Sequence, residues 1–461
     1  MHIADAAPSG PHRSGPPVPP AEVSGGLPLI GHGLAAARDL TAVLERGYRE
    51  HGEVFSLRLA GQRAVVLLGS ARSRYFLAQT GRALSIRAAY PFFIRMFDPE
   101  FYLFAAPEEY QRQRDLVLPR LRGRQLQGYV ALMEAETRAL TDRLGERGEF
   151  DLVETLGPLV MRIAAHAFLG QDFRNRLEDG LFAQFRRFSQ GMDPVWPGWL
   201  PLPHLVRSRL ARNRLRSVML RLVQERRSQP AADPDDFLQL LCQARYADGA
   251  PVPDMVLVNL ILLLTWAGHE TTTGHLAWAL IDLLRHPAEL QRVLREQGGV
   301  LAGDEPLTLD RVHRLRHLNR ALHETERLHP VAFVLARRAV EDLTVDGYRI
   351  PAGTTVLISP ALTHRLPAEH AEPDSYRPDR YAEDPHAVHR LTGFGGGAHR
   401  CLGTHFAYLE MAVVLTRLLQ RYDLRLLDPN PRPVPGNQTK WPQGPCRIRY
   451  ELRRGSELAA A

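Results

Sequence analysis

A long helical segment near the middle of the chain constrains the fold most. Pro253-Asp254 opens it, because the Asp254 carboxylate can accept hydrogen bonds from the free N–H groups of a first turn, and Pro287 stops it after His286. At about 1.5 Å per residue, this helix is about 50 Å long. A helix of that length crosses a whole domain, so the remaining elements must pack around it.

The chain shows no segment typical of a membrane anchor or a secretory signal. The most apolar stretch, Met255 to Gly268, is interrupted by Asn259 and is shorter than the roughly 20 residues that span a bilayer. Residues 1–24 are rich in Pro and Gly and hold no apolar core, which predicts a flexible tail. The 3 cysteines are too few for a disulfide framework. We therefore expect a soluble, cytoplasmic protein without a transmembrane segment.

The rest of the chain predicts a mainly α-helical domain with small β-sheets, over residues 25–461. Residues 107–254 space their apolar side chains at helical intervals. Residues 54–69 alternate around Gly61-Gln62 like a β-hairpin, and residues 343–361 read as short strands with turns at Asp346-Gly347 and Ala352-Gly353.

The charge balance gives little sign of a nucleic-acid partner. The net charge of +7 arises from 58 basic and 51 acidic residues, a modest surplus for 461 residues. One local cluster of arginines consists of Arg112, Arg114, Arg120, Arg122 and Arg124. A solvated helix face is the simplest interpretation of such a cluster.

A glycine-rich loop presents one of the three cysteines. Gly395 to Gly397 precede Cys401, and an amphipathic helix follows. A thiol at a helix N-terminus faces the positive end of the helix dipole, which lowers its pKa, and glycines let the backbone fold tightly under a flat macrocycle. On the residues alone, Cys401 could also be a buried hydrophobic residue, or a catalytic nucleophile with His399 or His405 as its base.

The ten residues from Phe394 to Gly403 resemble the haem-binding loop of the cytochrome P450 family. They match its Phe, Gly, basic residue, Cys and Gly in order and spacing. The resemblance implies that Cys401 is the axial thiolate of haem b, which favours O–O cleavage. It further implies that Phe394, Gly395 and Gly403 build the loop, and that His399 contacts a haem propionate.

The long helix carries a second motif of the same family. Ala267 to Thr272 is similar to the oxygen-activation motif, and Thr271 can hydrogen-bond to the carbonyl of Ala267. The resemblance implies that Ala267 leaves room beside the haem, that Thr271 holds hydrogen bonds to bound oxygen, and that Glu270 gates protons. It also implies a triangular, prism-shaped helical fold with haem between this helix and the helix after the cysteine.

Other residues match structural positions of the family. Glu324 and Arg327 are three apart on one helix face, and with Arg380 they match the family's Glu-x-x-Arg and arginine triad. Arg337 stands where the family places an arginine that binds a propionate. Tyr110 and Arg114 stand at its Trp-x-x-x-Arg helix, with Tyr in place of Trp.

The branch of bacterial sterol 14α-demethylases gives the nearest likeness, with two departures. That branch usually carries histidine at Glu270, and Pro and Gly at Arg95 and Asp98. We therefore expect a monooxygenase that hydroxylates or stepwise oxidises a terpenoid, polyketide or similar secondary metabolite. The alternatives are sterol 14α-demethylation, and a haem-thiolate isomerase or ligand-binding protein without oxygen chemistry. The expected pocket is apolar and contains Tyr90, Phe93, Phe97, Thr265, Ala267, Val331 and Val334.

No flavin or nicotinamide segment is visible after the last predicted strands. We therefore expect O2 as co-substrate and electrons from a separate ferredoxin or flavodoxin with its reductase. The arginine cluster that begins at Arg112 is a candidate docking surface for such an acidic protein.

Overall fold

The chain divides into two compact units, each assembled from discontinuous segments. Unit 1 comprises residues 1–90, 323–401 and 433–440, and unit 2 comprises 91–322, 402–432 and 441–461. The computed structural model describes residues 16–453, except for 60, 99–100, 124, 176–179, 193–198, 231–235, 302–304, 429 and 436–438. Each unit is described by itself below.

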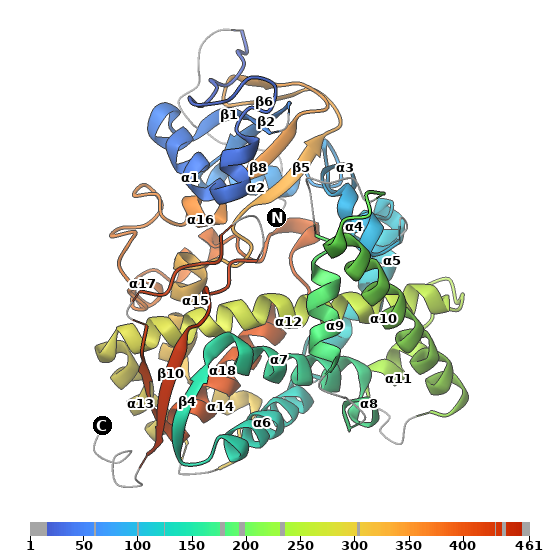
Figure 1. Ribbon diagram of the computed structural model, residues 1–461, viewed down its shortest axis with the longest axis vertical. Helices are drawn as coiled ribbons and strands as arrows, with labels where there is room; N and C mark the ends of the chain where they lie inside the picture. The colour runs from blue at the N-terminus through green and yellow to red at the C-terminus, as the bar shows by residue number, and fades with distance from the viewer. Residues whose placement is uncertain are drawn as a thin grey trace. The chain divides into compact units, whose positions relative to one another are not determined.

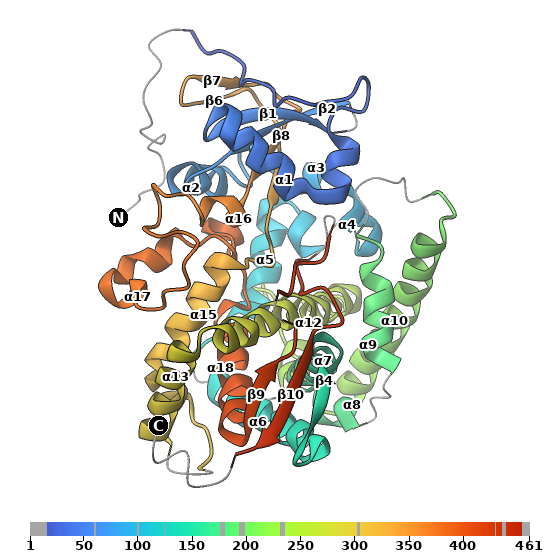
Figure 2. The ribbon, with the colours of Figure 1, turned by 60° about the vertical axis from the view of Figure 1, so that its left-hand side comes forward.

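Unit 1 is built on a five-stranded sheet in the order β1-β2-β8-β5-β3. Its strands are β1 (Val54–Leu59), β2 (Gln62–Leu67), β3 (Leu84–Ser85), β5 (Leu335–Ala339) and β8 (Thr355–Ile358). Strands β1 and β2 pair antiparallel with Leu59 opposite Gln62, which confirms the predicted hairpin. A second pair, β6 (Leu343–Val345) and β7 (Tyr348–Ile350), turns at Asp346 and Gly347, both with positive φ, as predicted (Figure 2).

Short helices cover this sheet and its loops. They are α1 (Gly33–His51), α2 (Ser70–Ala78), α3 (Ile86–Ala89), α16 (Pro360–Thr363), α17 (Arg380–Glu383), η3 (Pro385–Arg390) and η4 (Gly397–His399). Helix α1 packs on the hairpin so closely that a Cβ at Gly47 would collide with the Phe55 ring. The core here consists of residues such as Leu44, Phe55 and Leu57, all fully buried.

Part of the predicted N-terminal tail is held on both sheets of unit 1. Val23 N donates to Ser56 O at 2.9 Å, the Val23 side chain is buried, and Val18 bridges to Tyr348. Residues 16–24 therefore add backbone hydrogen bonds to strand edges. The first 15 residues of the predicted tail lie outside the described residues.

Unit 2 is predominantly helical, and helix α15 (Arg316–Leu328) runs from it into unit 1. Its helices are α4 (Pro91–Met96), η1 (Tyr102–Phe104), α5 (Pro107–Val117), η2 (Leu118–Leu121), α6 (Gln125–Leu144), α7 (Leu152–Leu169), α8 (Gln171–Asn175), α9 (Gly180–Ser189), α10 (Pro203–Ser228), α11 (Phe237–Cys242), α12 (Asp254–Arg285), α13 (Pro287–Val300), α14 (Leu309–Arg314) and α18 (Thr404–Arg421). A three-stranded sheet joins β4 (Arg147–Asp151), β10 (Arg447–Leu452) and β9 (Tyr422–Leu426) in that order.

The predicted long helix is α12, which packs against α7, α10 and α18 (Figure 1). Its N-cap differs from the prediction, because Pro253 is the cap residue and makes no side-chain cap hydrogen bond. The Asp254 carboxylate instead pairs with Arg227 Nη1 at 2.9 Å. An arginine from another helix therefore competes for the carboxylate that the local sequence assigns to capping.

Among the residues that the structure describes, α7 and α12 are the two helices long and apolar enough to cross a membrane by length and composition. In each, most of the apolar window is buried inside the protein, at 72% and 67% respectively. Burial of this extent is typical of core helices in soluble proteins.

Candidate active site

The cysteine loop of unit 1 is a tight turn held by its own backbone. Cys401 N donates to Phe394 O at 3.0 Å, and Gly395 N donates to Thr392 O at 2.9 Å. Gly395 and Gly397 have φ of 67° and 62°, which L side chains rarely adopt. Cys401 is an exposed, unbridged thiol at the end of this turn.

The loop packs against the end of helix α2. A Cβ at Gly397 would lie 3.2 Å from the carbonyl oxygen of Leu77, and a Cβ at Gly396 would lie 2.9 Å from Leu77 Cδ1. The glycines thus permit both the turn and its close approach to α2. The sequence predicted the first requirement, but only the fold shows the second.

Two basic side chains of unit 1 approach the turn at Thr80-Gly81. Arg337, on β5, is buried and donates from Nε to Thr80 Oγ1 at 3.1 Å, and its guanidinium lies 5.2 Å from the centre of the Phe76 ring. His399, on η4, reaches within 3.7 Å of the point where a Cβ on Gly81 would stand. Arg337 and His399, which are 62 residues apart in sequence, therefore both lie near this turn of unit 1.

The acid and alcohol of α12 lie in unit 2. Thr271 Oγ1 donates to Ala267 O at 2.8 Å, the hydrogen bond that the spacing predicts. Glu270, whose side chain is 12% exposed, has its pKa raised to about 7 by burial. At neutral pH, the Glu270 carboxyl group is therefore protonated in a substantial fraction of the molecules.

Ser189, Trp266 and Trp441, which belong to no predicted motif, hold Glu270 in place. Ser189 Oγ lies 3.0 Å from Glu270 Oε2, and Trp266 Nε1 donates to Ser189 Oγ at 2.8 Å. Trp441 Nε1 donates to the backbone carbonyl of Glu270, also at 2.8 Å. Ser189 and Trp441 are far from Glu270 in sequence and follow no motif spacing.

Glu324, Arg327 and Arg380 come together as a buried cluster in unit 1. Arg327 Nε and Nη2 each donate to a different Glu324 oxygen at 2.9 Å. Arg380 Nε lies 2.9 and 3.0 Å from the two Glu324 oxygens. Arg327 also donates to the backbone carbonyls of His364 and Ser375, so the cluster fastens the segment that leads to the cysteine loop.

Tyr110 and Arg114 on α5 belong to a polar chain within unit 2. Arg114 Nη1 donates to Tyr110 Oη at 3.2 Å, and Tyr102 Oη donates to Tyr110 Oη at 3.4 Å. The rings of Tyr102 and Tyr110 stack with centroids 4.8 Å apart. Burial raises the pKa of Tyr102, so its hydroxyl stays protonated and can donate.

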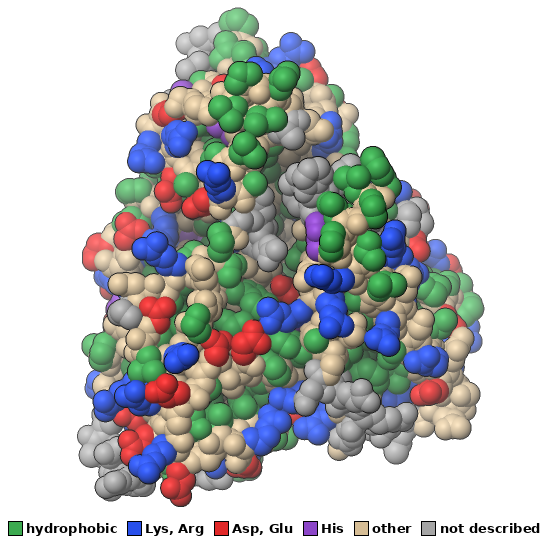
Figure 3. All heavy atoms as spheres, in the orientation of Figure 1, with side chains coloured by type: hydrophobic (Ala, Val, Ile, Leu, Met, Phe, Trp, Pro, Cys, Tyr) green, Lys and Arg blue, Asp and Glu red, His purple; other side chains and the backbone are tan. Residues whose placement is uncertain are grey.

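Some arginines of the cluster that begins at Arg112 have partners within unit 2. Arg112 Nη2 pairs with Asp248 at 2.9 Å, and Arg120 Nη2 donates to Leu240 O at 2.9 Å. On the face drawn in Figure 3, basic and acidic side chains are interspersed. The charge of Arg112 is therefore paired, whereas Arg120 binds a neutral carbonyl, which does not neutralise its charge.

The expected pocket residues are divided between the two units. In unit 2, Phe93 and Phe97 contact the Trp266 ring, with centroids 5.8 and 5.9 Å apart, and Thr265 is fully buried. In unit 1, Tyr90 Oη accepts a hydrogen bond from Ala336 N at 2.8 Å. Also in unit 1, Val331 O lies 3.4 Å from Lys440 N, and Val334 packs on the hairpin core. A shared pocket for these side chains stays a prediction.

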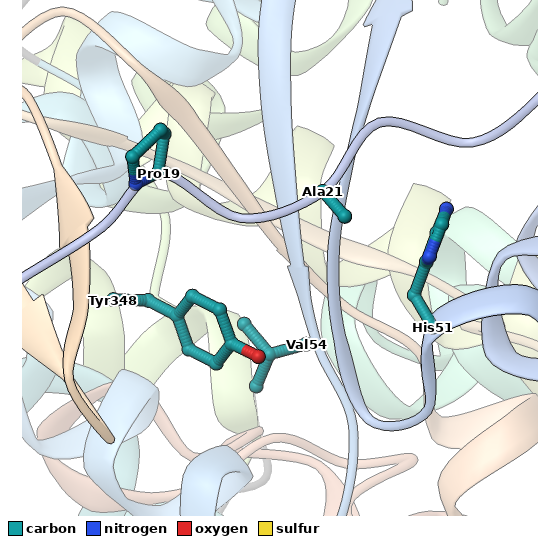
Figure 4. A pocket seen from close by; sticks show the side chains of 5 residues that line it. All are labelled: Pro19, Ala21, His51, Val54 and Tyr348. Atoms are coloured by element: carbon teal, nitrogen blue, oxygen red, sulfur yellow. The ribbon is translucent and has the colours of Figure 1, made fainter. Parts of the chain in front are cut away.

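A separate pocket of about 220 Å³ opens in unit 1 (Figure 4). It is lined by Pro19, Ala21, His51, Val54 and Tyr348. None of the candidate site residues lines it. We assign it no part in the active site.

Comparisons with known proteins place the chain in a family. The cytochrome P450 family matches residues 19–448. A sterol 14alpha-demethylase of Mycolicibacterium vanbaalenii is 31% identical over 446 residues, which cover 94% of this chain and 97% of that protein. The lanosterol 14-alpha demethylase of Homo sapiens is 30% identical, over 87% of this chain and 80% of that protein.

A solved structure supports the same assignment. A retinoic acid-bound cyanobacterial P450 superposes with a TM-score of 0.84 at 25% identity, over 95% of this chain and 100% of that one. The predicted family and the predicted mainly α fold with small sheets are thereby confirmed. This chain belongs to the cytochrome P450 family and is a haem b-dependent monooxygenase.

Proposed function

We propose that this enzyme hydroxylates or stepwise oxidises a hydrophobic small molecule, such as a terpenoid or polyketide of secondary metabolism. The observation that carries the proposal is the adjacent acid and alcohol on α12. Thr271 is anchored to Ala267 O, and Glu270 is a buried acid with a pKa of about 7. An acid that is partly protonated at neutral pH is suited to give and regain a proton during turnover.

The residues of unit 1 fit a haem. Cys401 ends a glycine turn as an exposed thiol and would be the iron ligand, with Phe394, Gly395 and Gly403 forming the loop. Arg337 would supply positive charge for a propionate, and His399 would contact a propionate. Arg114 with Tyr110, which belong to unit 2, are proposed as further propionate contacts. When bound, the haem supplies oxygen binding and activation, which the thiolate ligand favours.

The protein's own groups then have distinct roles. Thr271 orients its hydroxyl through the Ala267 carbonyl, and Glu270, the preceding residue of α12, holds a proton that it can release near neutral pH. Ala267, a small residue one turn earlier, leaves space beside these groups. The cluster of Glu324, Arg327 and Arg380 fixes the backbone that precedes the cysteine loop and would have a structural role only.

Sterol 14α-demethylation is the second candidate function. The relatives at 31% and 30% identity that are named sterol or lanosterol 14-alpha demethylases favour it. Against it stands the acid at position 270, where that branch usually has histidine. The departures at Arg95 and Asp98 lie in the segment that carries the expected pocket residues Phe93 and Phe97.

A substrate titration separates the two functions. The haem-loaded protein is titrated with terpenoids, polyketides and a 14α-methyl sterol, and the shift of the Soret band from low to high spin is recorded. We expect a shift, and an oxygenated product with O2 and a reducing system, for a terpenoid or polyketide. A shift and product with the sterol alone would refute the first function and establish the second.

The ligand, the electron donor and the cellular location are proposed on the same basis. A Soret band near the position typical of thiolate ligation should appear when the reduced protein binds carbon monoxide, and an imidazole-type spectrum would refute Cys401 as the ligand. Electrons are proposed to come from a ferredoxin or flavodoxin with its reductase, and the location is proposed to be cytoplasmic. Turnover that requires such an added donor would support the partner proposal.

A further inference from the structure

The hydroxyl of Ser189 lies between an indole and the acid of α12. Ser189 is the last residue of α9, and its Oγ lies 3.0 Å from Glu270 Oε2. Trp266 Nε1 donates to the same oxygen at 2.8 Å. A third group, the carbonyl oxygen of Phe185, lies 3.1 Å from Ser189 Oγ. All four groups belong to unit 2.

A hydroxyl has one hydrogen to donate and two lone pairs to accept. The indole N–H only donates, so it always occupies one lone pair of Ser189. When Glu270 is ionised, the Ser189 hydrogen points to Oε2. When Glu270 is protonated, its O–H donates to the second lone pair, and the Ser189 hydrogen turns to the carbonyl of Phe185. Ser189 therefore has a partner for either protonation state of the acid.

The indole that anchors Ser189 is itself fixed by aromatic packing. The Trp266 ring lies 5.8 Å from Phe93 and 5.9 Å from Phe97, and it lies 6.0 Å from Phe188 of α9. Edge-on and tilted ring pairs at these separations are favourable and directional. Ser189 is thus held at a defined place between α9 and α12.

The charged groups around Glu270 do not replace Ser189 as a partner. Arg186, also on α9, acts on Glu270 electrostatically, but its guanidinium pairs with Glu154 of α7 at 2.8 Å. His269 Nε2 lies 3.9 Å from Glu270 Oε2, but burial lowers the His269 pKa to about 3, so the ring is neutral at physiological pH. Trp441, from the segment before β10, binds only the backbone carbonyl of Glu270.

We propose that Ser189 is a positioning residue for Glu270, which holds the carboxyl group against α9 and reverses its hydrogen-bond role as the acid loses and regains its proton. No proton passes through the serine. The Glu270 O–H bond breaks as its proton passes to water and reforms when water returns a proton, while the Ser189 hydrogen turns from the Phe185 carbonyl to Glu270 Oε2 and back. This inference rests on the proposed function, since it assigns a partner to the acid of that site.

Infrared difference spectroscopy of the haem-loaded full chain tests the inference without depending on turnover. The C=O stretch of protonated Glu270 is followed against pH and identified by its loss in Glu270→Gln. In Ser189→Ala the stretch should move to higher wavenumber, because the carboxyl group loses a hydrogen bond. The midpoint should rise, because the hydrogen bond from Ser189 to the ionised carboxylate is charge-assisted and therefore stronger than the bond it accepts from the protonated acid.

Two further variants keep the test specific to the hydroxyl. Ser189→Thr keeps an O–H and should keep both the wild-type stretch and the wild-type midpoint. Ser217→Ala is the matched control, since exposed Ser217 on α10 also donates to a carbonyl four residues back, Asn213 O at 3.0 Å, and should change neither. A wild-type stretch and midpoint in Ser189→Ala would overturn the inference. Equal shifts in the Ala and Thr variants would do the same, because the hydroxyl would then not be the cause.

Failure of the proposed function gives a different signature. If the reduced wild-type protein with carbon monoxide shows no thiolate-type Soret band, the function fails while the infrared result still reports on Ser189. If that band forms, the alkaline limb of the turnover profile should move upward in Ser189→Ala with the infrared midpoint. A profile that stays in place would overturn the positioning role.

Discussion

Replacing Glu324 by glutamine should destabilise the protein by about 3 kcal/mol, because it removes the negative charge from a fully buried ion cluster. Glu324 has no exposed surface and accepts from Arg327 Nε and Nη2, Arg380 Nε and Arg377 N, at 2.8 to 3.0 Å. Glutamine keeps the shape but turns an N–H₂ group toward guanidinium donors.

The size of the expected loss of stability depends on the hydrogen-bond acceptors that Arg327 and Arg380 keep in the Glu324→Gln variant. Breaking a buried ion pair by removing one partner costs about 3 to 5 kcal/mol. Arg327 still has three backbone carbonyls as acceptors, and Arg380 keeps those of Ala371, Glu372 and Ser375. These remaining bonds place the expected loss at the lower end of that range.

The assay is urea unfolding of the haem-loaded protein, followed by far-ultraviolet circular dichroism. Asp374→Asn is the control, because it removes the same charge from an exposed pair with Arg365, where Asp374 is 80% exposed. Such a pair contributes at most about 1 kcal/mol. Glu324→Gln should also lower the fraction of protein that shows the thiolate-type carbon monoxide spectrum. A free energy of unfolding within about 1 kcal/mol of the control would refute the reasoning.

Three more outcomes follow from the site. Thr271→Ala should retain haem but divert reducing equivalents to hydrogen peroxide, measured as peroxide formed per nicotinamide consumed. Thr271→Ser keeps a hydroxyl and should keep nicotinamide consumption coupled to product. Unchanged coupling in the Ala variant would contradict the role of the hydroxyl. Gly397→Ala should cost about 1 to 2 kcal/mol and lower haem occupancy, because φ is +62° and the Cβ would press on the Leu77 carbonyl, while exposed Gly128→Ala should cost nothing. Burial lowers the pKa of His364 from 6.5 to about 3, so between these pH values the unfolded chain binds a proton that the folded chain does not. The free energy of unfolding should therefore fall as the pH drops from 7 to 4. His364→Gln should flatten that fall, measured by urea midpoints over the same pH range.

Local patterns in the sequence were sufficient for features that depend on near neighbours. The long helix, the β1–β2 hairpin and the turn at Asp346-Gly347 all follow from spacing and turn chemistry. The hydrogen bond from Thr271 to Ala267 and the ion pair of Glu324 with Arg327 arise because helix geometry brings residues three and four apart together.

The cysteine loop was recognisable for a different reason. Its ten residues combine glycines, a basic residue and Cys401 in a fixed order, and the family comparison confirms the family that this order predicts, while the role of Cys401 stays a proposal. Composition and periodicity alone would have left Cys401 as a buried hydrophobic residue or a nucleophile. The haem-thiolate identity therefore depended on the resemblance.

Only the tertiary structure decided the contacts between distant segments. Ser189 reaches Glu270 across 81 residues, and Arg380 reaches Glu324 across 56. Asp254, which the sequence assigned to a helix cap, pairs instead with Arg227. Burial of apolar surface determines which helices pack together, and buried polar groups then form hydrogen bonds with the polar groups that this packing brings near. The sequence by itself predicted which residues carry the chemistry, whereas packing decided which distant partners contact Glu270 and Glu324 and, through burial, raises the pKa of Glu270.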